Sequence, residues 1–267
     1  MKTLQDKKAK LVSFLSGLDS LLVAFSGGVD STLLTAVAHT ALGNRLLAVT
    51  AISPLHPEQE TRAAKDLAKK IGVRHTLIQS KEMMLSDVTR NPLDRCYHCK
   101  THLFDLLLKI AGENDIQCVA HGANLDDLDD YRPGFKAARE MQIRAPLVDA
   151  GLTKADIREL SREMGLESWD KPAMACLASR IPYGTTLTVE KLAMVETAEK
   201  VLHQLGFRHC RVRHHDKLAR IEVPQEAFSK ILENETADEI VGRLRVLGFK
   251  HISLDLEGYV QGSMNPK

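Results

Sequence analysis

The sequence lacks the features that place a protein in a membrane or on a nucleic acid. Among its 267 residues, no apolar run approaches the ~18 residues of a membrane span, and the segment Met1–Lys8 contains no apolar signal region. An excess of charge of one sign is also absent, because 36 Lys and Arg residues stand against 35 Asp and Glu residues. A nearly neutral chain gives no electrostatic argument for nucleic-acid binding. We therefore expect a cytoplasmic protein with one large domain or with a larger and a smaller one.

Cysteine is sparse, and the number of cysteines is odd. In a reducing compartment, five cysteines indicate ligands or reactive groups more than disulfides. Only one C-x-x-C pair is present, Cys96 and Cys99, so the second pair of a four-cysteine zinc site is missing. On its own, the pair is compatible with half a zinc site that His98 or His102 completes, with a redox pair, or with chance.

Two standard nucleotide-binding motifs are missing as well. The chain has neither the Lys of a Walker loop nor the third Gly of a dinucleotide fingerprint. It has instead the loop Ser26-Gly27-Gly28-Val29-Asp30-Ser31, between the apolar run 21–25 and a helical apolar pattern that Gly43 ends. Adjacent glycines let backbone amides approach an anion, the serines add hydroxyls, and the helix start adds positive charge. The loop resembles the pyrophosphatase loop, S-G-G-x-D-S, of enzymes that cleave ATP to AMP and pyrophosphate.

Apolar runs and helical patterns alternate along the first part of the chain. Runs typical of buried strands cover residues 21–25, 46–52, 73–78, 117–122 and 143–148. This alternation predicts an α/β fold with a parallel five-stranded sheet and helices on both faces. A polar segment with two prolines follows. We predict an ATP pyrophosphatase domain at 1–168, a linker at 169–187 and a smaller C-terminal α/β domain at 188–267.

The C-terminal part contains a weak repeat. Residues 204–209, Gln-Leu-Gly-Phe-Arg-His, are similar to residues 246–251, Val-Leu-Gly-Phe-Lys-His. Each stretch is typical of a helix end, a glycine cap and the start of a strand.

Acidic residues follow the fourth predicted strand. Ligands of parallel sheets bind beyond the carboxyl ends of the strands, so this loop belongs beside the glycine loop. Asn124 and Asp126 are candidates for cofactor binding there, because one or two carboxylates typically hold Mg²⁺ against the phosphates of ATP. Asp129 and Asp130 are better explained as solvated or helix-capping residues.

A third cysteine of interest, Cys176, lies in the predicted linker, which passes near the ligand edge of the sheet. A C-x-x-C pair plus one distant cysteine can hold three irons of a four-iron cluster and leave the fourth iron open. Cys118 lies among apolar residues, and Cys210 has no cysteine near it in sequence. We interpret both as structural.

Basic residues recur beyond this segment. Arg211, Arg213 and His215 project to one face if they form a strand, and two guanidinium groups on one face can grip a phosphate. Arg180 precedes them in the linker, and a solvated strand face explains the spacing equally well. Two acidic residues are candidate salt-bridge partners or metal ligands, namely Glu199 and Glu222.

Taken together, the motifs resemble the LarE family, the ATP-dependent sulfur transferases that make the nickel-pincer nucleotide cofactor of lactate racemase. The resemblance covers nearly the whole chain. It rests on the stretches Ser26–Ser31, Asp130–Gly134, Ser179–Leu187, Arg211–Arg213 and Ala219–Glu222. The first stretch is common to many pyrophosphatase-loop enzymes, and the later ones are more specific.

The resemblance implies a reaction in two half-steps. ATP adenylates a carboxylate of a pyridinium biscarboxylic acid mononucleotide, and sulfur then displaces AMP to leave a thiocarboxylic acid. The implied pyrophosphate ligands are Ser26, Gly27, Gly28, Asp30 and Ser31, with Mg²⁺ on Asp30. The implied ligands of the nucleotide substrate are Lys100, Arg180, Arg211 and Arg213. Carboxylates matching Glu199 and Glu222 bind an additional divalent ion in family members.

Two sulfur sources occur in the family that the chain resembles. One form sacrifices the sulfur of a cysteine in the position of Cys176, and the other carries an extra sulfide on a [4Fe–4S] cluster held by three cysteines. Cys96 and Cys99 are absent from the sacrificial form, so the resemblance favours a cluster on Cys96, Cys99 and Cys176. Family members form hexamers, which implies a homo-oligomer here.

Three other functions share parts of the pattern. A tRNA thiolase also combines a pyrophosphatase loop with a three-cysteine cluster, but the net charge of +1 and the single C-x-x-C pair do not favour an RNA-binding protein. An amide-forming ligase of the NAD synthetase or GMP synthetase kind needs ammonia and leaves the three cysteines without a role. A non-catalytic nucleotide-binding module would bind ATP without releasing pyrophosphate.

Overall fold

The fold is that of a computed structural model, which describes residues 3–128, 133–172 and 175–260. Asp129 and Asp130 therefore lie outside the described residues. No helix in the described part of the chain is long and apolar enough to cross a membrane.

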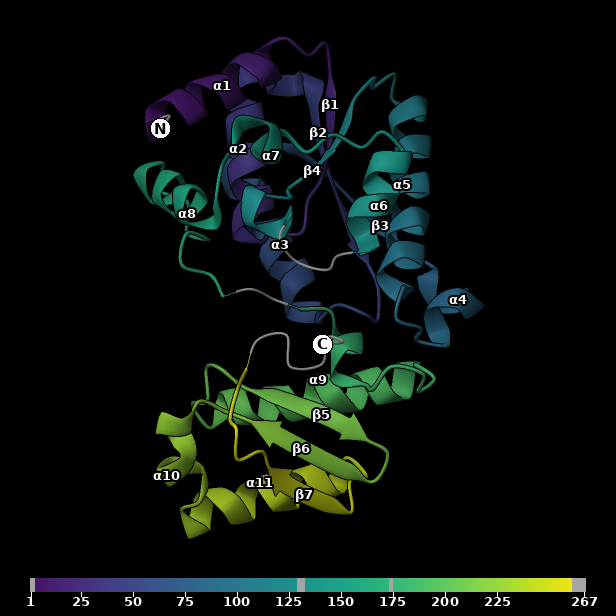
Figure 1. Ribbon diagram of the computed structural model, residues 1–267, viewed down its shortest axis with the longest axis vertical. Helices are drawn as coiled ribbons and strands as arrows, with labels where there is room; N and C mark the ends of the chain where they lie inside the picture. Colours follow the sequence, from purple (N-terminus) through teal and green to yellow (C-terminus); the bar gives the residue numbers. More distant parts are fainter. Residues whose placement is uncertain (1–2, 129–132, 173–174, 261–267) are drawn as a thin grey trace. The chain divides into compact units, whose positions relative to one another are not determined.

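The chain forms two compact units (Figure 1). The first contains Met1–Val88 and Asp94–Met174, and the second contains Thr89–Leu93 and Ala175–Lys267. The predicted linker at 169–187 is thus shared between the units. The functional division of the chain into two domains and a linker stays a prediction.

A parallel sheet forms the centre of the first unit, with its strands in the order β3-β2-β1-β4. These strands are β1 (Leu21–Ala24), β2 (Leu46–Ile52), β3 (Arg74–Gln79) and β4 (Val119–His121). Successive side chains of β1 point to opposite faces, so Leu21 and Val23 enter one core and Leu22 enters the other. Because both faces are covered, the strand is apolar throughout.

Helices cover both faces of this sheet, as the sequence predicts. One face packs against α1 (Leu4–Ser16), α2 (Val29–Leu42), α3 (Glu58–Ile71), α7 (Pro146–Ala150) and α8 (Lys154–Glu163). The other face packs against α5 (Arg95–Glu113) and α6 (Pro133–Glu140). A short helix, α4 (Ser86–Thr89), ends where the chain enters the second unit. The architecture is the α/β fold of pyrophosphatase-loop ATPases.

The predicted fifth strand, 143–148, is wrong. Among the described residues the sheet has four strands, and this segment contributes only an isolated bridge between Arg144 and Ala120. Pro146 then begins α7. Proline has no N–H to donate to a strand ladder, and its fixed φ suits the first turn of a helix. The segment therefore turns away from the sheet after one residue of pairing.

The helix predicted from about Lys100 begins five residues earlier, at Arg95. Its first turn is polar, so apolar periodicity does not reveal it. As a result, the C-x-x-C pair lies inside the helix rather than ahead of it.

The second unit is a small α/β structure with a sheet in the order β5-β6-β7. The strands are β5 (Arg211–His215), β6 (Leu218–Glu222) and β7 (His251–Leu254). The helices are α9 (Val189–Gln204), α10 (Phe228–Ile231) and α11 (Asn234–Val246), preceded by a single 3₁₀ turn, η4 (Leu177–Arg180). The first two strands are antiparallel, and β7 is parallel to β6.

The predicted repeat is confirmed as two similar helix-to-strand turns. Gly206 follows α9 and Gly248 follows α11, both with positive φ, 86° and 107°. Phe207 and Phe249 come next, and both side chains are buried in the same core. A glycine cap at each helix end thus delivers an aromatic residue to the core.

Five residues from the first half of the chain belong to the second unit. The buried side chain of Asn91 donates hydrogen bonds to the carbonyl oxygens of Ile181, at 3.2 Å, and Pro182, at 2.8 Å. The backbone carbonyl oxygen of Asn91 accepts a hydrogen bond from the backbone N–H of Gly184 at 2.8 Å. No pattern in the sequence predicts this insertion, because it depends on hydrogen bonds between distant residues.

Candidate active site

The glycine loop connects β1 to α2. The hydroxyl oxygens of Ser26 and Ser31 lie 3.1 Å apart, and Ser31 Oγ donates to the carbonyl oxygen of Gly28 at 3.2 Å. The serines therefore brace the loop from within. Within the described chain no side chain caps the helix start at Gly28. The backbone N–H groups in the first turn of α2 are thus available to bind an anion, as at other phosphate-binding helix starts.

Two glycines let the backbone pass close to neighbouring elements here. A Cβ atom on Gly27, whose φ is 69°, would lie 2.9 Å from Cα of Ala64 on α3. A Cβ atom on Gly122, just after β4, would lie 2.8 Å from the backbone nitrogen of Ser31. Both distances are shorter than real Cβ contacts, so any larger residue would displace the loop.

The loop after β4 lies beside the glycine loop. The buried side chain of Asn124 donates to Oδ1 of Asp30 at 3.2 Å. Asp126 accepts a hydrogen bond from the backbone N–H of Lys154 at 2.8 Å, and the Lys154 ammonium pairs with Oδ2 of Asp30. The roles of Asn124 and Asp126 in cofactor binding stay predictions. The contact of Lys154 was missed, because Thr153–Asp156 indicated only a helix cap.

The imidazoles of His121 and His56 and the ammonium of Lys100 lie near the carboxyl edge of the sheet. The ring of His121, at the end of β4, meets the rings of Phe104 and Phe135 edge-on, at 5.8 and 5.7 Å. Burial, together with the positive charge of Lys100, lowers the pKa of His121 to about 4. The same two causes lower the pKa of His56. Both imidazoles are therefore neutral at neutral pH, and Lys100 carries the positive charge at this edge.

The cysteines are divided between the two units. Cys96 and Cys99 lie three residues apart at the start of α5, on one face of the helix. Cys176 immediately precedes η4 in the second unit. None of the five cysteines forms a disulfide. His98, the candidate zinc ligand, instead pairs with Asp94 at 3.3 Å.

The remaining two cysteines have the environment of structural residues. Burial raises the pKa of Cys118 and, with the charge of Glu199, raises the pKa of Cys210 to about 12. Such thiols stay protonated and unreactive at neutral pH. Throughout the described residues, no group of three or more His, Cys, Asp or Glu side chains could hold a metal ion.

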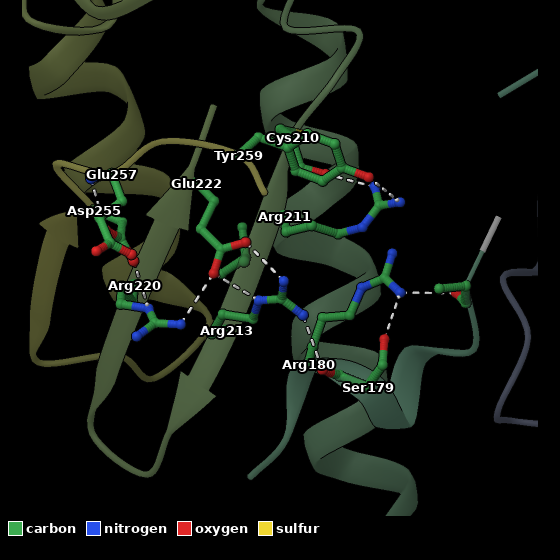
Figure 2. A network of polar contacts seen from close by, with 12 residues as sticks. Ser179, Arg180, Cys210, Arg211, Arg213, Arg220, Glu222, Asp255, Glu257 and Tyr259 are labelled. Carbon is green, nitrogen blue, oxygen red and sulfur yellow. Dashed lines mark hydrogen bonds and ion pairs between the residues drawn. The ribbon is translucent and has the colours of Figure 1, made fainter. Parts of the chain in front are cut away.

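A fully buried arginine holds the Cys176 turn in the second unit (Figure 2). Arg180 forms a two-point ion pair with Glu199 on α9, at 2.9 and 3.0 Å. Its remaining terminal nitrogen donates to the carbonyl oxygens of Ala175 and Cys176, at 2.7 and 3.1 Å. Glu199 also accepts from the backbone N–H of Val212 on β5 at 3.1 Å. One ion pair thus joins the turn, the helix and the sheet.

A second buried pair reinforces the same turn. Arg213 pairs with Glu222 at 2.8 and 2.7 Å, and its third donor reaches the carbonyl oxygen of Ser179 at 2.9 Å. Arg220 adds a contact to Glu222 at 3.0 Å (Figure 2). Glu199 and Glu222 are therefore the salt-bridge partners of Arg180 and Arg213, which is one of the two roles that the sequence left open. Their role as metal ligands stays a prediction.

Arg211 differs from its neighbours. Its guanidinium donates to the carbonyl oxygen of Cys210 at 2.7 Å and to the hydroxyl of Tyr259 at 3.3 Å. Among the described residues it forms no ion pair, and burial and the charge of Arg180 lower its pKa. Unlike Arg180 and Arg213, it has no carboxylate at ion-pair distance among the described residues, although the charge of Glu199 favours its protonated form.

Comparison with known proteins places these features in a family. A family model described as asparagine synthase matches residues 13–101, which include the glycine loop. Pyridinium-3,5-bisthiocarboxylic acid mononucleotide synthase from Lactiplantibacillus plantarum is 40% identical over 269 residues, which cover 99% of this chain and 96% of that protein. The chain belongs to the LarE family. It is accordingly an ATP-dependent sulfur-transferring enzyme.

Similarity of this extent is found in other organisms too. An uncharacterized protein of Synechocystis sp. is 44% identical over 98% of both chains. Another, from Methanocaldococcus jannaschii, is 30% identical over 90% of both chains. The LarE resemblance drawn from the motifs is thus confirmed, and it extends over both structural units.

Replacing Gly122 with Ala should weaken ATP binding by this LarE-family enzyme at least tenfold. The added methyl group would lie 2.8 Å from the backbone nitrogen of Ser31 and would push the start of α2 away. Isothermal titration calorimetry measures the affinity. The control is Gly112→Ala, at an exposed position of α5 with nothing within 4 Å, which should leave the affinity unchanged. Wild-type affinity in Gly122→Ala would contradict the steric argument.

Replacing Glu199 with Gln should lower the free energy of unfolding by about 3–5 kcal/mol, because it leaves the buried Arg180 charge without a carboxylate. Urea denaturation measures the change. Glu239 forms an exposed pair with Arg243 in the same unit, so Glu239→Gln is the control and should cost less than about 1 kcal/mol. Equal losses in the two variants would refute the structural role of the Arg180 pair.

His121 should make the protein less stable in mild acid. Its folded pKa of about 4 lies below the ordinary histidine pKa of 6.5, so between these pH values the unfolded chain binds more protons and stability falls as the pH falls. The slope is at most about 1.4 kcal/mol per pH unit. His121→Phe keeps a ring and removes the titration, so its urea-unfolding free energy should fall less from pH 7 to pH 4. Replacement of the exposed His251 by Phe is the control; identical slopes for wild type and His121→Phe would contradict the assignment.

Proposed function

We propose that this LarE-family enzyme inserts sulfur into the carboxylates of a pyridinium biscarboxylic acid mononucleotide, during synthesis of the nickel-pincer nucleotide cofactor that lactate racemase uses. The observation that carries the proposal is the near full-length similarity to the L. plantarum synthase, whose name describes the bisthiocarboxylic product. The glycine loop and the guanidinium groups of the second unit support it, because the reaction needs a site for ATP and a site for an anionic nucleotide.

The first half-reaction makes a carboxylate reactive. A carboxylate oxygen of the substrate attacks the α-phosphorus of ATP, a new P–O bond forms, and pyrophosphate leaves. Ser26, Ser31 and the first-turn amides of α2 would hold the leaving pyrophosphate and stabilise its charge. Asp30 would bind Mg²⁺ against the phosphates, with Asn124 and Asp126 nearby. The product is an acyl adenylate whose leaving group is AMP.

The second half-reaction is acyl substitution. A sulfur nucleophile attacks the acyl carbon, the C–O bond to AMP breaks, and a thiocarboxylate remains. A second round on the other carboxylate would consume a second ATP. Arg211 would bind a phosphate or carboxylate group of the nucleotide, since its guanidinium donates here to two neutral oxygens, those of Cys210 and Tyr259. Lys100 would add a positive charge at the edge of the first unit. Arg180 and Arg213, predicted as ligands of the nucleotide, are buried and would act by holding the Cys176 turn.

We propose that Cys96, Cys99 and Cys176 hold a [4Fe–4S] cluster. The donor set fits: Cys96 and Cys99 share one helical face at a helix start, and neither is consumed in a disulfide. When bound, such a cluster would supply sulfide to the acyl adenylate. The role of the chain is to fix the backbone on either side of the Cys176 turn through Arg180 and Arg213.

Mass spectrometry tests the sulfur source. The protein is incubated with ATP, Mg²⁺ and the biscarboxylated nucleotide, both as purified in air and after anaerobic reconstitution with iron and sulfide. We expect an unchanged mass at Cys176, with thiolated product only in the reconstituted sample. A loss of about 34 Da at Cys176, the mass of hydrogen sulfide, would show sacrificial transfer and overturn the cluster proposal.

The variants Cys96→Ala and Cys118→Ala form a matched pair for the same experiment. Cys96→Ala should lose iron and nearly all product formation, whereas Cys118→Ala should keep both, because Cys118 has a thiol pKa raised by burial. Iron content gives a readout independent of turnover. Full activity of Cys96→Ala with wild-type iron content would also reject the cluster.

Light scattering of the purified protein tests the proposed homo-oligomer.

A further inference from the structure

The glycine loop contains no cation of its own. Residues 26–31 include no Lys or Arg, and they include the carboxylate of Asp30. A bound triphosphate carries several negative charges. The loop offers it only backbone amides, hydroxyl groups and a helix start, and the negative charge of Asp30 lies close by. Additional positive charge must therefore come from elsewhere in the chain or from a metal ion.

Lys154 lies on one side of the loop. It is the first residue of α8, and its ammonium pairs with Oδ2 of Asp30. Asn124 holds the other carboxylate oxygen, and Asp126 fixes the backbone N–H of Lys154. The Lys154 side chain is still 35% exposed, so solvent and ligands can reach it.

Lys171 lies against another part of the same loop. Its ammonium donates to the carbonyl oxygen of Gly27 at 3.2 Å and pairs with Glu60 of α3 at 2.7 Å. The turn that carries it is tied to α8, since Arg158 donates to the carbonyl oxygens of Trp169 and Lys171 at 2.8 and 2.9 Å. The helix α8 therefore begins with Lys154 and, through Arg158, also holds the turn that carries Lys171.

We propose that Lys154 and Lys171 bind the β- and γ-phosphates of ATP and perform the task of the lysine that a Walker loop carries within its own sequence. The inference rests on the proposed use of the glycine loop as the ATP site of the adenylation. Without nucleotide, each ammonium is held next to the loop by a carboxylate, Asp30 or Glu60. With nucleotide, each ammonium exchanges this carboxylate for a phosphate oxygen.

The exchange is favourable on electrostatic grounds. The Lys154 pair with Asp30 is partly exposed and contributes little net stability, so leaving Asp30 costs little, whereas a charge-assisted hydrogen bond to phosphate is strong. Movement of Lys154 to a phosphate would also release one oxygen of Asp30, the residue proposed to bind Mg²⁺. Lys154 would therefore hold the Asp30 carboxylate in place until nucleotide arrives.

Binding measurements with three ligands test this inference. Calorimetry of the full chain with ATP, inorganic pyrophosphate and AMP is compared for wild type, Lys154→Met and Lys171→Met. Each substitution should weaken ATP and pyrophosphate binding by about tenfold or more and change AMP binding less than twofold, because AMP lacks the β- and γ-phosphates. Lys154→Arg should recover most of the ATP affinity, since it retains the charge. These titrations use no pyridinium nucleotide, so they test the two lysines independently of the proposed substrate.

Lys7→Met is the matched control. Lys7 forms a similarly buried ion pair with Asp156, also on α8, at 2.6 Å, and this pair includes no residue of the loop. It should retain wild-type affinity for all three ligands. Wild-type ATP binding in both Lys154→Met and Lys171→Met would overturn the inference. Equal weakening of ATP and AMP would overturn it as well, because it would indicate general disruption of the site.

Discussion

Burying a guanidinium group away from water is costly unless a carboxylate is buried with it, and this requirement organises the second unit. Arg180 needs Glu199, which places α9 beside the 3₁₀ turn. The donors of Arg180 that Glu199 does not occupy hold the carbonyl groups of Ala175 and Cys176. The backbone next to the sulfur-bearing residue is thus fixed by this ion-pair network, in addition to the burial of Leu177 and Ala178 in the same turn.

In the first unit, by contrast, the site depends on backbone donors that stay accessible to an anion. Its glycine loop leaves helix amides uncapped, and two close backbone approaches, at Gly27 and Gly122, keep side chains out of the loop. The cost of an uncapped helix start is offset by the serine contacts within the loop and by the large cores on both faces of the sheet. One unit therefore presents a site open to an anion, and the other presents cations already organised by carboxylates.

Local patterns were sufficient to predict most of the fold. The strands at 21–25 and 46–52 and the glycine-capped turns of the second unit follow from periodicity and from glycine, which act within a few residues. The false strand at 143–148 came from an apolar run in which Pro146 outweighed strand propensity. The start of α5 was missed because its first turn is polar and therefore shows no apolar periodicity.

The candidate site was less predictable, because its contacts join distant residues. The sequence identified Arg180 and Glu199 separately but left open whether the carboxylate is a salt-bridge partner or a metal ligand. Lys154 and Lys171 gave no signal at all, since a lysine in a helix cap and another in a polar turn are ordinary surface residues. Only the folded chain brings their ammonium groups to the glycine loop.

The insertion of residues 89–93 into the second unit means that this unit is not a contiguous module. The chain passes between the units three times, after Val88, after Leu93 and before Ala175, and Asn91 supplies buried hydrogen bonds that nothing after residue 174 replaces. A single protease cut before Ala175 would leave five residues of the second unit, 89–93, on the fragment that carries the first unit. Gene fusion or recombination at one breakpoint cannot transfer the second unit intact, so the two units are expected to have been inherited together.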